Sequence, residues 1–125
     1  MNNSRPEAVI QRFSSLLAQG DLDAMMDLYE PEAAFAPQPG TAVAGHEQIR
    51  AALEGFLAVQ PRMDGAIEKV LEAGDTALVA NRWRLTGRAP DGSPVEMAGT
   101  SADVLRRRAD GSWGILIDDP WGAAV

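Results

Sequence analysis

The chain has 125 residues, a formal net charge of −7, one histidine and no cysteine. These totals exclude disulfides, thiolate metal sites and a multi-histidine metal centre, and the negative charge argues against nucleic-acid binding. The one basic run, Arg106–Arg108, is interpreted as a solvated strand end. No window approaches the roughly 18 consecutive apolar residues of a membrane span, and no signal-peptide pattern is present. We expect one cytoplasmic domain over 1–125, with no nucleic-acid or membrane partner and no metal or other cofactor.

Three helices are predicted in the N-terminal half. Apolar residues recur at helical spacing over 6–18, and Gly20 ends this helix. A second, shorter helix is predicted over 22–30 and a third over 46–59. The segment between the last two, 33–45, is predicted to be a short strand followed by a connection rich in proline and glycine.

Long strands dominate the rest of the chain. Extended runs cover 65–74, 76–87, 94–109 and 112–118. Gly-Asp or Asp-Gly pairs separate them, and Asp-Gly between extended runs is a strong hairpin signal. Helices followed by an antiparallel meander predict an α+β fold, with the helices packed on one face of a single sheet.

Two segments carry a resemblance to a known superfamily. The stretch "AVIQRFSSLLAQGDLDAMMDLYEPEAAFAPQPGTAVAGHEQIRAAL" resembles the N-terminal half of Δ5-3-ketosteroid isomerases and of the wider NTF2-like, or SnoaL-like, superfamily. The stretch "GTSADVLRRRADGSWGILIDDPWG" resembles bacterial NTF2-like proteins of the YybH and DUF4440 type. The resemblance implies an NTF2-like (cystatin-like) cone, in which three helices pack on a curved antiparallel sheet around an apolar pocket. It also implies a homodimer through the outer face of the sheet.

The isomerases use three functional groups, and only one of them has a match here. Phe13 occupies the position of the family's oxyanion-binding Tyr, and Pro37 or a neighbour stands where the family has its general base. Asp103 matches the third group, an acid that an apolar site keeps neutral in those isomerases. The resemblance therefore implies a pocket acid. It argues against ketosteroid isomerisation by the known mechanism, because proton abstraction needs a base within reach of the substrate.

Asp103 also stands out without the resemblance, because strand interiors disfavour Asp. Alternation places it on one strand face together with Met97 and Leu105. The pattern alone leaves the inward face undecided, since both faces mix polar and apolar residues. The resemblance favours an inward Asp103.

The last strand offers a second carboxylate. Alignment with the isomerases turns Leu116 and Asp118 toward the pocket and Asp119 away, but a shift of one residue would exchange the two acids. If Asp103 and Asp118 share an apolar pocket, repulsion and desolvation raise the pKa of at least one, as in many acid–base sites. Alternatively, Asp119 caps a turn where the sheet ends. His46 is either a cap of the third helix or a base at the pocket rim.

Several other side chains are candidates for contact with a ligand. Asn81, on the apolar face of 76–87, needs a buried partner or a ligand, because an unpaired buried amide is costly. Tyr29, at the end of the second helix, is either a pocket hydroxyl or a core residue. Trp83 is either core or a ligand platform, and Trp121 either closes the cavity or holds the C-terminus. The predicted ligand contacts are Phe13, Tyr29, Phe56, Asn81, Trp83, Met97, Leu105, Leu116 and Trp121.

These features leave three functions open. The first, which the loss of two isomerase groups favours, is a pocket that binds a hydrophobic, carbonyl-bearing small molecule. The second is a cofactor-independent isomerase, cyclase or dehydratase of polyketide- or steroid-like substrates, using Asp103 with Asp118 or His46. The third is association through the sheet, which leaves a buried Asp103 without a role. Chemistry like that of limonene epoxide hydrolase would need Arg82 or Arg84 beside Asp103, but alternation puts those arginines on the opposite face.

Overall fold

The computed structural model describes residues 4–122. The elements along the chain are α1 (Pro6–Gln19), α2 (Leu22–Asp27), β1 (Tyr29–Gln38), β2 (Thr41–Ala44), α3 (His46–Leu57), β3 (Arg62–Ala73), β4 (Thr76–Arg88), β5 (Pro94–Thr100), β6 (Ala102–Arg107) and β7 (Trp113–Asp119). None of the helices in this part of the chain has the length and hydropathy needed to cross a membrane. The cytoplasmic location stays a prediction.

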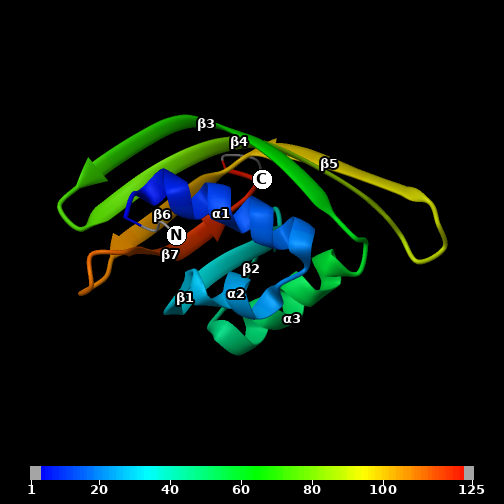
Figure 1. The fold of residues 1–125 in the computed structure, drawn as a ribbon, viewed down its shortest axis with the longest axis horizontal. Coiled ribbons are helices and arrows are strands. Elements are labelled where there is room, and N and C mark those ends of the chain that lie inside the picture. The colour runs from blue at the N-terminus through cyan, green and yellow to red at the C-terminus, as the bar shows by residue number, and fades with distance from the viewer. Residues whose placement is uncertain (1–3, 123–125) are drawn as a thin grey trace.

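The strands form one seven-stranded sheet in the order β2-β1-β7-β6-β4-β3, and β5 also pairs with β4. Figure 1 shows β3, β4 and β5 as a long arch, with the three helices on its concave side. The predicted α+β class and the three helices on a curved sheet are therefore confirmed. The sheet is mixed rather than wholly antiparallel, because β1 and β7 run parallel. Hairpin signals constrain only strands that are joined by short turns, whereas most of the chain separates β1 from β7.

Element boundaries differ from the sequence-based prediction at several places. The second helix ends at Asp27, so Tyr29 is the first residue of β1 and not the end of a helix. Strand pairing replaces the helix here, since the Ile115 N–H donates to the Leu28 carbonyl at 2.7 Å. The proline-rich connection contains β2, which pairs with β1. The strand expected over 94–109 is divided at Ser101 into β5 and β6, both paired with β4.

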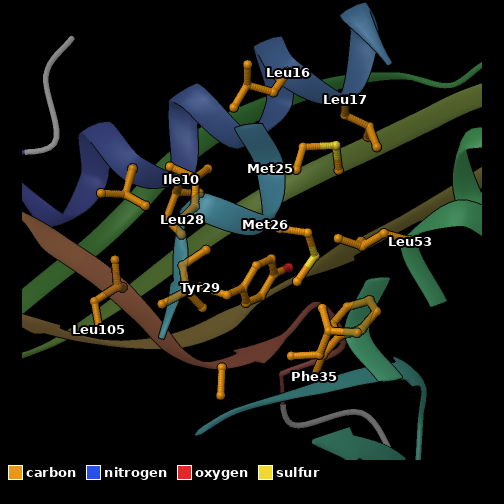
Figure 2. Close-up of a cluster of buried hydrophobic side chains, with 14 of the residues drawn as sticks. Ile10, Leu16, Leu17, Met25, Met26, Leu28, Tyr29, Phe35, Leu53 and Leu105 are labelled. Carbon is orange, nitrogen blue, oxygen red and sulfur yellow. The ribbon is translucent and has the colours of Figure 1, made fainter. Parts of the chain in front are cut away.

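The core lies between the helices and the concave face of the sheet. In β4, burial alternates strictly along the strand, and its inward face is the predicted one. Figure 2 shows part of this core, with Tyr29 among the side chains of α1, α2 and α3. The buried apolar residues of the helices are Val9, Ile10, Leu16, Leu17, Met25, Met26, Ile49 and Leu53. Those of β4, β6 and β7 are Ala77, Val79, Trp83, Leu85, Leu105, Trp113 and Ile115.

A buried ion-pair cluster holds the start of β1 against β6. Glu30 is only 5% exposed, and its Oε1 accepts hydrogen bonds from Arg106 Nε and Nη2 at 3.1 and 2.9 Å. Its Oε2 accepts from Arg108 Nε at 2.6 Å. Arg108 also donates to the Asp27 carbonyl at 2.9 Å. The basic run is thus a structural anchor and not only a solvated strand end. The sequence could not show this, because no pattern in it places Glu30 beside the run.

A substitution at Gly114 tests this anchor, because the missing side chain of Gly114 leaves room for the charged groups of Glu30 and Arg108. A Cβ added at Gly114 would overlap Oε2 of Glu30 and lie 2.6 Å from Nε of Arg108. We expect Gly114→Ala to lower the free energy of unfolding by on the order of 3 kcal/mol, because a buried ion pair must move. Urea unfolding measures the change.

Gly55→Ala is the matched control. Gly55 lies on the exposed side of α3, where an added Cβ meets nothing within 4 Å. The free energy of unfolding should rise there by about 0.5–1 kcal/mol. Equal effects of the two substitutions would contradict the account of the anchor.

Candidate functional site

A cavity lies between α1, α3 and the concave face of the sheet. Its volume is about 60 Å³, which is room for several water molecules, and a second hollow of about 210 Å³ adjoins it at Ser14 and Asn81. Most of the lining is apolar or aromatic: Ile10, Phe13, Leu17, Phe35, Leu53, Phe56, Met63, Trp83, Leu85, Met97, Ile115, Pro120 and Trp121. The polar lining residues are Ser14, Asn81, Ser101, Asp103 and Asp118.

Four residues of α1 form one wall of the cavity: Ile10, Phe13, Ser14 and Leu17. They stand at positions i, i+3, i+4 and i+7, which share one face of a helix. The sequence interpretation selected only Phe13, from its match to the isomerase Tyr. Helical spacing from Phe13 would have found the other three.

Asp103 and Asp118 meet at the sheet wall of the cavity. They are direct partners across β6 and β7, so both side chains leave the sheet on the same face. Asp103 is only 2% exposed, whereas Asp118 is half-buried, and both line the cavity. Their carboxyl groups share a hydrogen bond, and the Tyr29 hydroxyl donates a second one to Oδ2 of Asp118 at 2.5 Å.

Burial raises the pKa of Asp103 well above its ordinary value. The charge of Asp118 and the hydrogen bond to it add to the rise, since that bond needs the Asp103 proton. Two donors oppose the rise: Ser101 Oγ lies 2.9 Å from Oδ2, and the Asp119 N–H lies 3.2 Å from Oδ1. Burial outweighs both, so Asp103 is the member of the pair that keeps its proton to the higher pH.

Asp118 is the carboxylate of the pair. Burial raises its pKa as well, but the hydrogen bonds from Asp103 and Tyr29 favour the charged form and limit the rise. Burial and the Asp118 charge also raise the pKa of Tyr29 well above 10.0, so its hydroxyl keeps its proton and stays a donor. Between their two titration steps, the two carboxyl groups therefore hold one proton, with the negative charge on Asp118.

A β-bulge decides which residues of β7 face the cavity. Val104 pairs with Ile117, but the next residue of β6 pairs with Ile115. Leu116 is therefore the extra residue of the bulge, and it does not line the cavity, contrary to the prediction. Ile115 and Asp118 both face inward. Strict alternation could not have foreseen this, because a bulge changes the parity of a strand.

Three predicted site residues, His46, Tyr29 and Leu105, do not line the cavity. His46 is exposed at the start of α3, and its Nε2 lies 3.0 Å from the Tyr29 carbonyl oxygen instead of at the cavity. Tyr29 reaches the site only through Asp118, and its ring packs edge-to-face on Phe13 at 6.3 Å. Leu105 is fully buried in the core below the cavity. The other predicted contacts, Phe13, Phe56, Asn81, Trp83, Met97 and Trp121, do line it.

The two tryptophans form an apolar wall, and their N–H groups are already bonded. Trp83 Nε1 donates to the Pro120 carbonyl at 2.7 Å, and Trp121 Nε1 donates to the Ala36 carbonyl at 3.0 Å. Their rings meet edge-to-face at 5.4 Å. Neither indole N–H is therefore available to a ligand.

Arg82 and Arg84 do not reach the cavity. Both are exposed, and they pair with Glu68 and Glu96 at 2.9 and 3.2 Å. Within residues 4–122, no three His, Cys, Asp or Glu side chains gather as a group that could hold a metal ion.

Asp103→Asn tests the neutral state of Asp103. With a pKa higher in the folded than in the unfolded protein, folded Asp103 keeps a proton that the unfolded chain releases, so wild-type stability falls as pH rises above the unfolded value. Asn cannot ionise and escapes this loss. From about pH 4 to about pH 8, the variant should gain on the order of 1 kcal/mol or more over wild type. Urea unfolding at both pH values measures this, and a relative loss at the higher pH would mean that Asp103 folds as a carboxylate.

Comparison with known proteins agrees with the fold. A family model described as SnoaL-like domain matches residues 10–113. One similar structure is that of a protein from Xanthomonas campestris described as a candidate calcium/calmodulin-dependent protein kinase II association domain. The identity is 26%, the match covers 90% of this chain and 81% of that one, and the TM-score is 0.76. The chain is 19% identical to a ketosteroid isomerase-like protein from Erwinia carotovora atroseptica, covering 90% and 88% with a TM-score of 0.79.

A third similar structure is that of a candidate dehydratase of the NTF2-like family from Streptomyces avermitilis. The identity is 16%, the match covers 95% of this chain and 94% of that one, and the TM-score is 0.79. No curated protein matches the chain at a significant level. The finer resemblance to the YybH and DUF4440 type stays a prediction. The family model spans most of the sequence, and the chain therefore belongs to the SnoaL-like family, with an NTF2-like, cystatin-like fold.

Proposed function

We propose that the protein binds a compact, apolar, carbonyl-bearing molecule and catalyses proton transfer at the carbon next to its carbonyl group, without a cofactor. The observation that carries the proposal is the hydrogen-bonded pair of Asp103 and Asp118 at the wall of an apolar cavity. Two carboxyl groups whose surroundings separate an acid from a base are the usual means of proton transfer near neutral pH. The pair favours a reaction over simple binding, which would need only one acid or none.

Asp118 would act as the base. Its carboxylate takes a proton from the carbon next to the carbonyl group, and the electron pair of the broken C–H bond moves onto the carbonyl oxygen. Once protonated, Asp118 no longer attracts the Asp103 proton, which becomes available to the negative oxygen. Return of the proton from Asp118 to a conjugated carbon, as the electron pair moves back from the oxygen, completes an isomerisation. If the Asp118 proton is first replaced by one from solvent and then returns to the same carbon, the substrate has exchanged a hydrogen. Tyr29 positions Asp118 through its hydroxyl.

Binding without reaction is the second candidate, and the enclosure of Asp103 favours it. Asp103 is almost fully buried, and its two oxygens already accept hydrogen bonds from Ser101 and from the Asp119 N–H. An acid held in this way could serve only to fix the sheet wall of a pocket. The two candidates differ in whether a bound ketone exchanges its protons.

Deuterium exchange at the carbon next to the carbonyl of 2-tetralone, a two-ring ketone, separates the candidates. We expect the protein to accelerate this exchange in D2O, as followed by proton NMR. Asp118→Asn should lower the accelerated rate by roughly 10²–10⁴-fold, because it removes the base. Asp64→Asn, an exposed carboxylate of β3 outside the cavity, is the control and should keep the rate.

Two results of this experiment would contradict different parts of the proposal. Binding of 2-tetralone with no exchange above the buffer rate would support the binding function and contradict catalysis. A failure to bind 2-tetralone and smaller cyclic ketones would contradict the proposal as a whole.

We also propose that two copies associate through the outer face of the sheet. A continuous apolar stripe supports this: Leu71 pairs with Leu78, Leu78 with Val104, Val104 with Ile117, and Ile117 with Ala34. Leu71 and Ile117 are 57% and 44% exposed. Leu78, Val104 and Ala34 are half-buried. An apolar stripe that remains partly exposed across several strands is typical of a surface that another protein covers.

Ile117→Glu should weaken this association. A charge in the middle of an apolar interface costs its desolvation, so we expect the dissociation constant to rise at least about tenfold. Sedimentation velocity over a concentration series measures it. Thr86→Glu, an exposed position of β4 outside the stripe, is the control. A wild-type protein that stays monomeric at high concentration would contradict the homodimer.

A further inference from the structure

The side-chain amide of Asn81 is buried next to the cavity. Asn81 is 6% exposed and lies on the inward face of β4. It lines the main cavity and also a second hollow between α1 and β3, whose other walls include Ser14 and Gly65. The amide therefore lies where the two hollows adjoin.

The backbone of Asn81 is fully bonded, but its side chain is not. The backbone N–H donates to Ser101 Oγ at 3.2 Å, and the backbone carbonyl accepts from the Ser101 N–H at 2.8 Å. Within residues 4–122, no protein group forms a hydrogen bond with the Asn81 side-chain amide. A buried amide without a partner is costly, so such groups in folded proteins need an explanation.

Gly65 and Ser14 shape the surroundings of this amide. A Cβ added at Gly65 would lie 2.9 Å from Oδ1 and 3.1 Å from Nδ2 of Asn81, so the glycine keeps the space that the amide occupies. Ser14 comes from α1, on the other side of the cavity, and lines the same two hollows. One hydroxyl and one amide, which together offer donors and an acceptor, thus face a shared space.

We propose that Asn81 and Ser14 form a second polar subsite, which binds a hydroxyl or carbonyl oxygen at the far end of the ligand. The inference rests on the proposed function, because it takes Asp118 as the group at the near end. Val79 on β4 is level with Asp103 and Asp118, and Asn81 lies two residues further along β4. Two interstrand spacings and two residues along the strand put the backbones of Asn81 and Asp118 roughly 12 Å apart. The ligand class is therefore an apolar body with one oxygen at each end, such as a hydroxylated bicyclic ketone.

The test compares two ligands that differ by one hydroxyl group. Isothermal titration gives the dissociation constants of 2-tetralone and 6-hydroxy-2-tetralone, and we expect the hydroxylated ketone to bind about 5- to 10-fold more tightly, the gain from one buried hydrogen bond. Asn81→Leu should reduce this ratio to about one, and Ser14→Ala should reduce it in part. Ser15→Ala, on the exposed side of α1, is the matched control and should keep the ratio.

A second measurement does not depend on whether the Asn81→Leu protein folds. The side-chain NH₂ resonances of Asn81 in wild type should move when the hydroxylated ketone binds, and they should move much less with 2-tetralone. If 2-tetralone binds but the ratio is near one, or if Asn81→Leu keeps the ratio, the subsite is wrong and the proposed function stands. If neither ketone binds, the proposed function fails and the subsite fails with it.

Discussion

The candidate site depends on one contact, the pairing of Asp103 on β6 with Asp118 on β7. Two carboxyl groups side by side and largely removed from water cannot both be charged, because desolvation and mutual repulsion oppose the second charge. The pair therefore keeps one proton. Everything that makes the cavity chemically distinctive follows from this: a neutral acid, an adjacent base, and apolar walls that strengthen both effects.

The surrounding structure stabilises this costly arrangement. Tyr29 donates to Asp118, and its backbone is held from two sides, by His46 at its carbonyl and by the ion pairs of Glu30, the next residue. Ser101 and the Asp119 N–H fix Asp103. The ion-pair cluster around Glu30 thus helps to position Tyr29, the residue that donates to the base.

The predictable part of the fold was local. Helical spacing in α1 and α3 and the Asp-Gly turns between the later strands depend on neighbours in sequence, so the α+β architecture could be predicted. Alternation also placed Asn81 on the inward face of its strand. The parallel pairing of β1 with β7 could not be predicted, because no residue in either strand indicates which distant strand will lie beside it.

The same limit applies to the site. The resemblance to ketosteroid isomerases turned Asp103 inward, and alignment with the same isomerases also turned Asp118 toward the pocket. The bulge at Leu116 and the start of β1 at Tyr29 both result from tertiary pairing. Sequence reasoning therefore predicted that Leu116 faces the pocket and that Tyr29 ends a helix, and both predictions were wrong. The bonds of Ser101 to both Asn81 and Asp103 appear only when β4 and β6 are paired.

The most direct measurement is an NMR titration of the carboxyl carbons of Asp103 and Asp118, in wild type and in Asp118→Asn. The account predicts that Asp103 titrates well above the ordinary Asp value of about 3.9. It also predicts that the Asp103 midpoint falls when Asp118→Asn removes the neighbouring charge, because that charge contributes to the rise. Two carboxyl groups that titrate near or below the ordinary value, independently of each other, would contradict the shared proton and the function built on it.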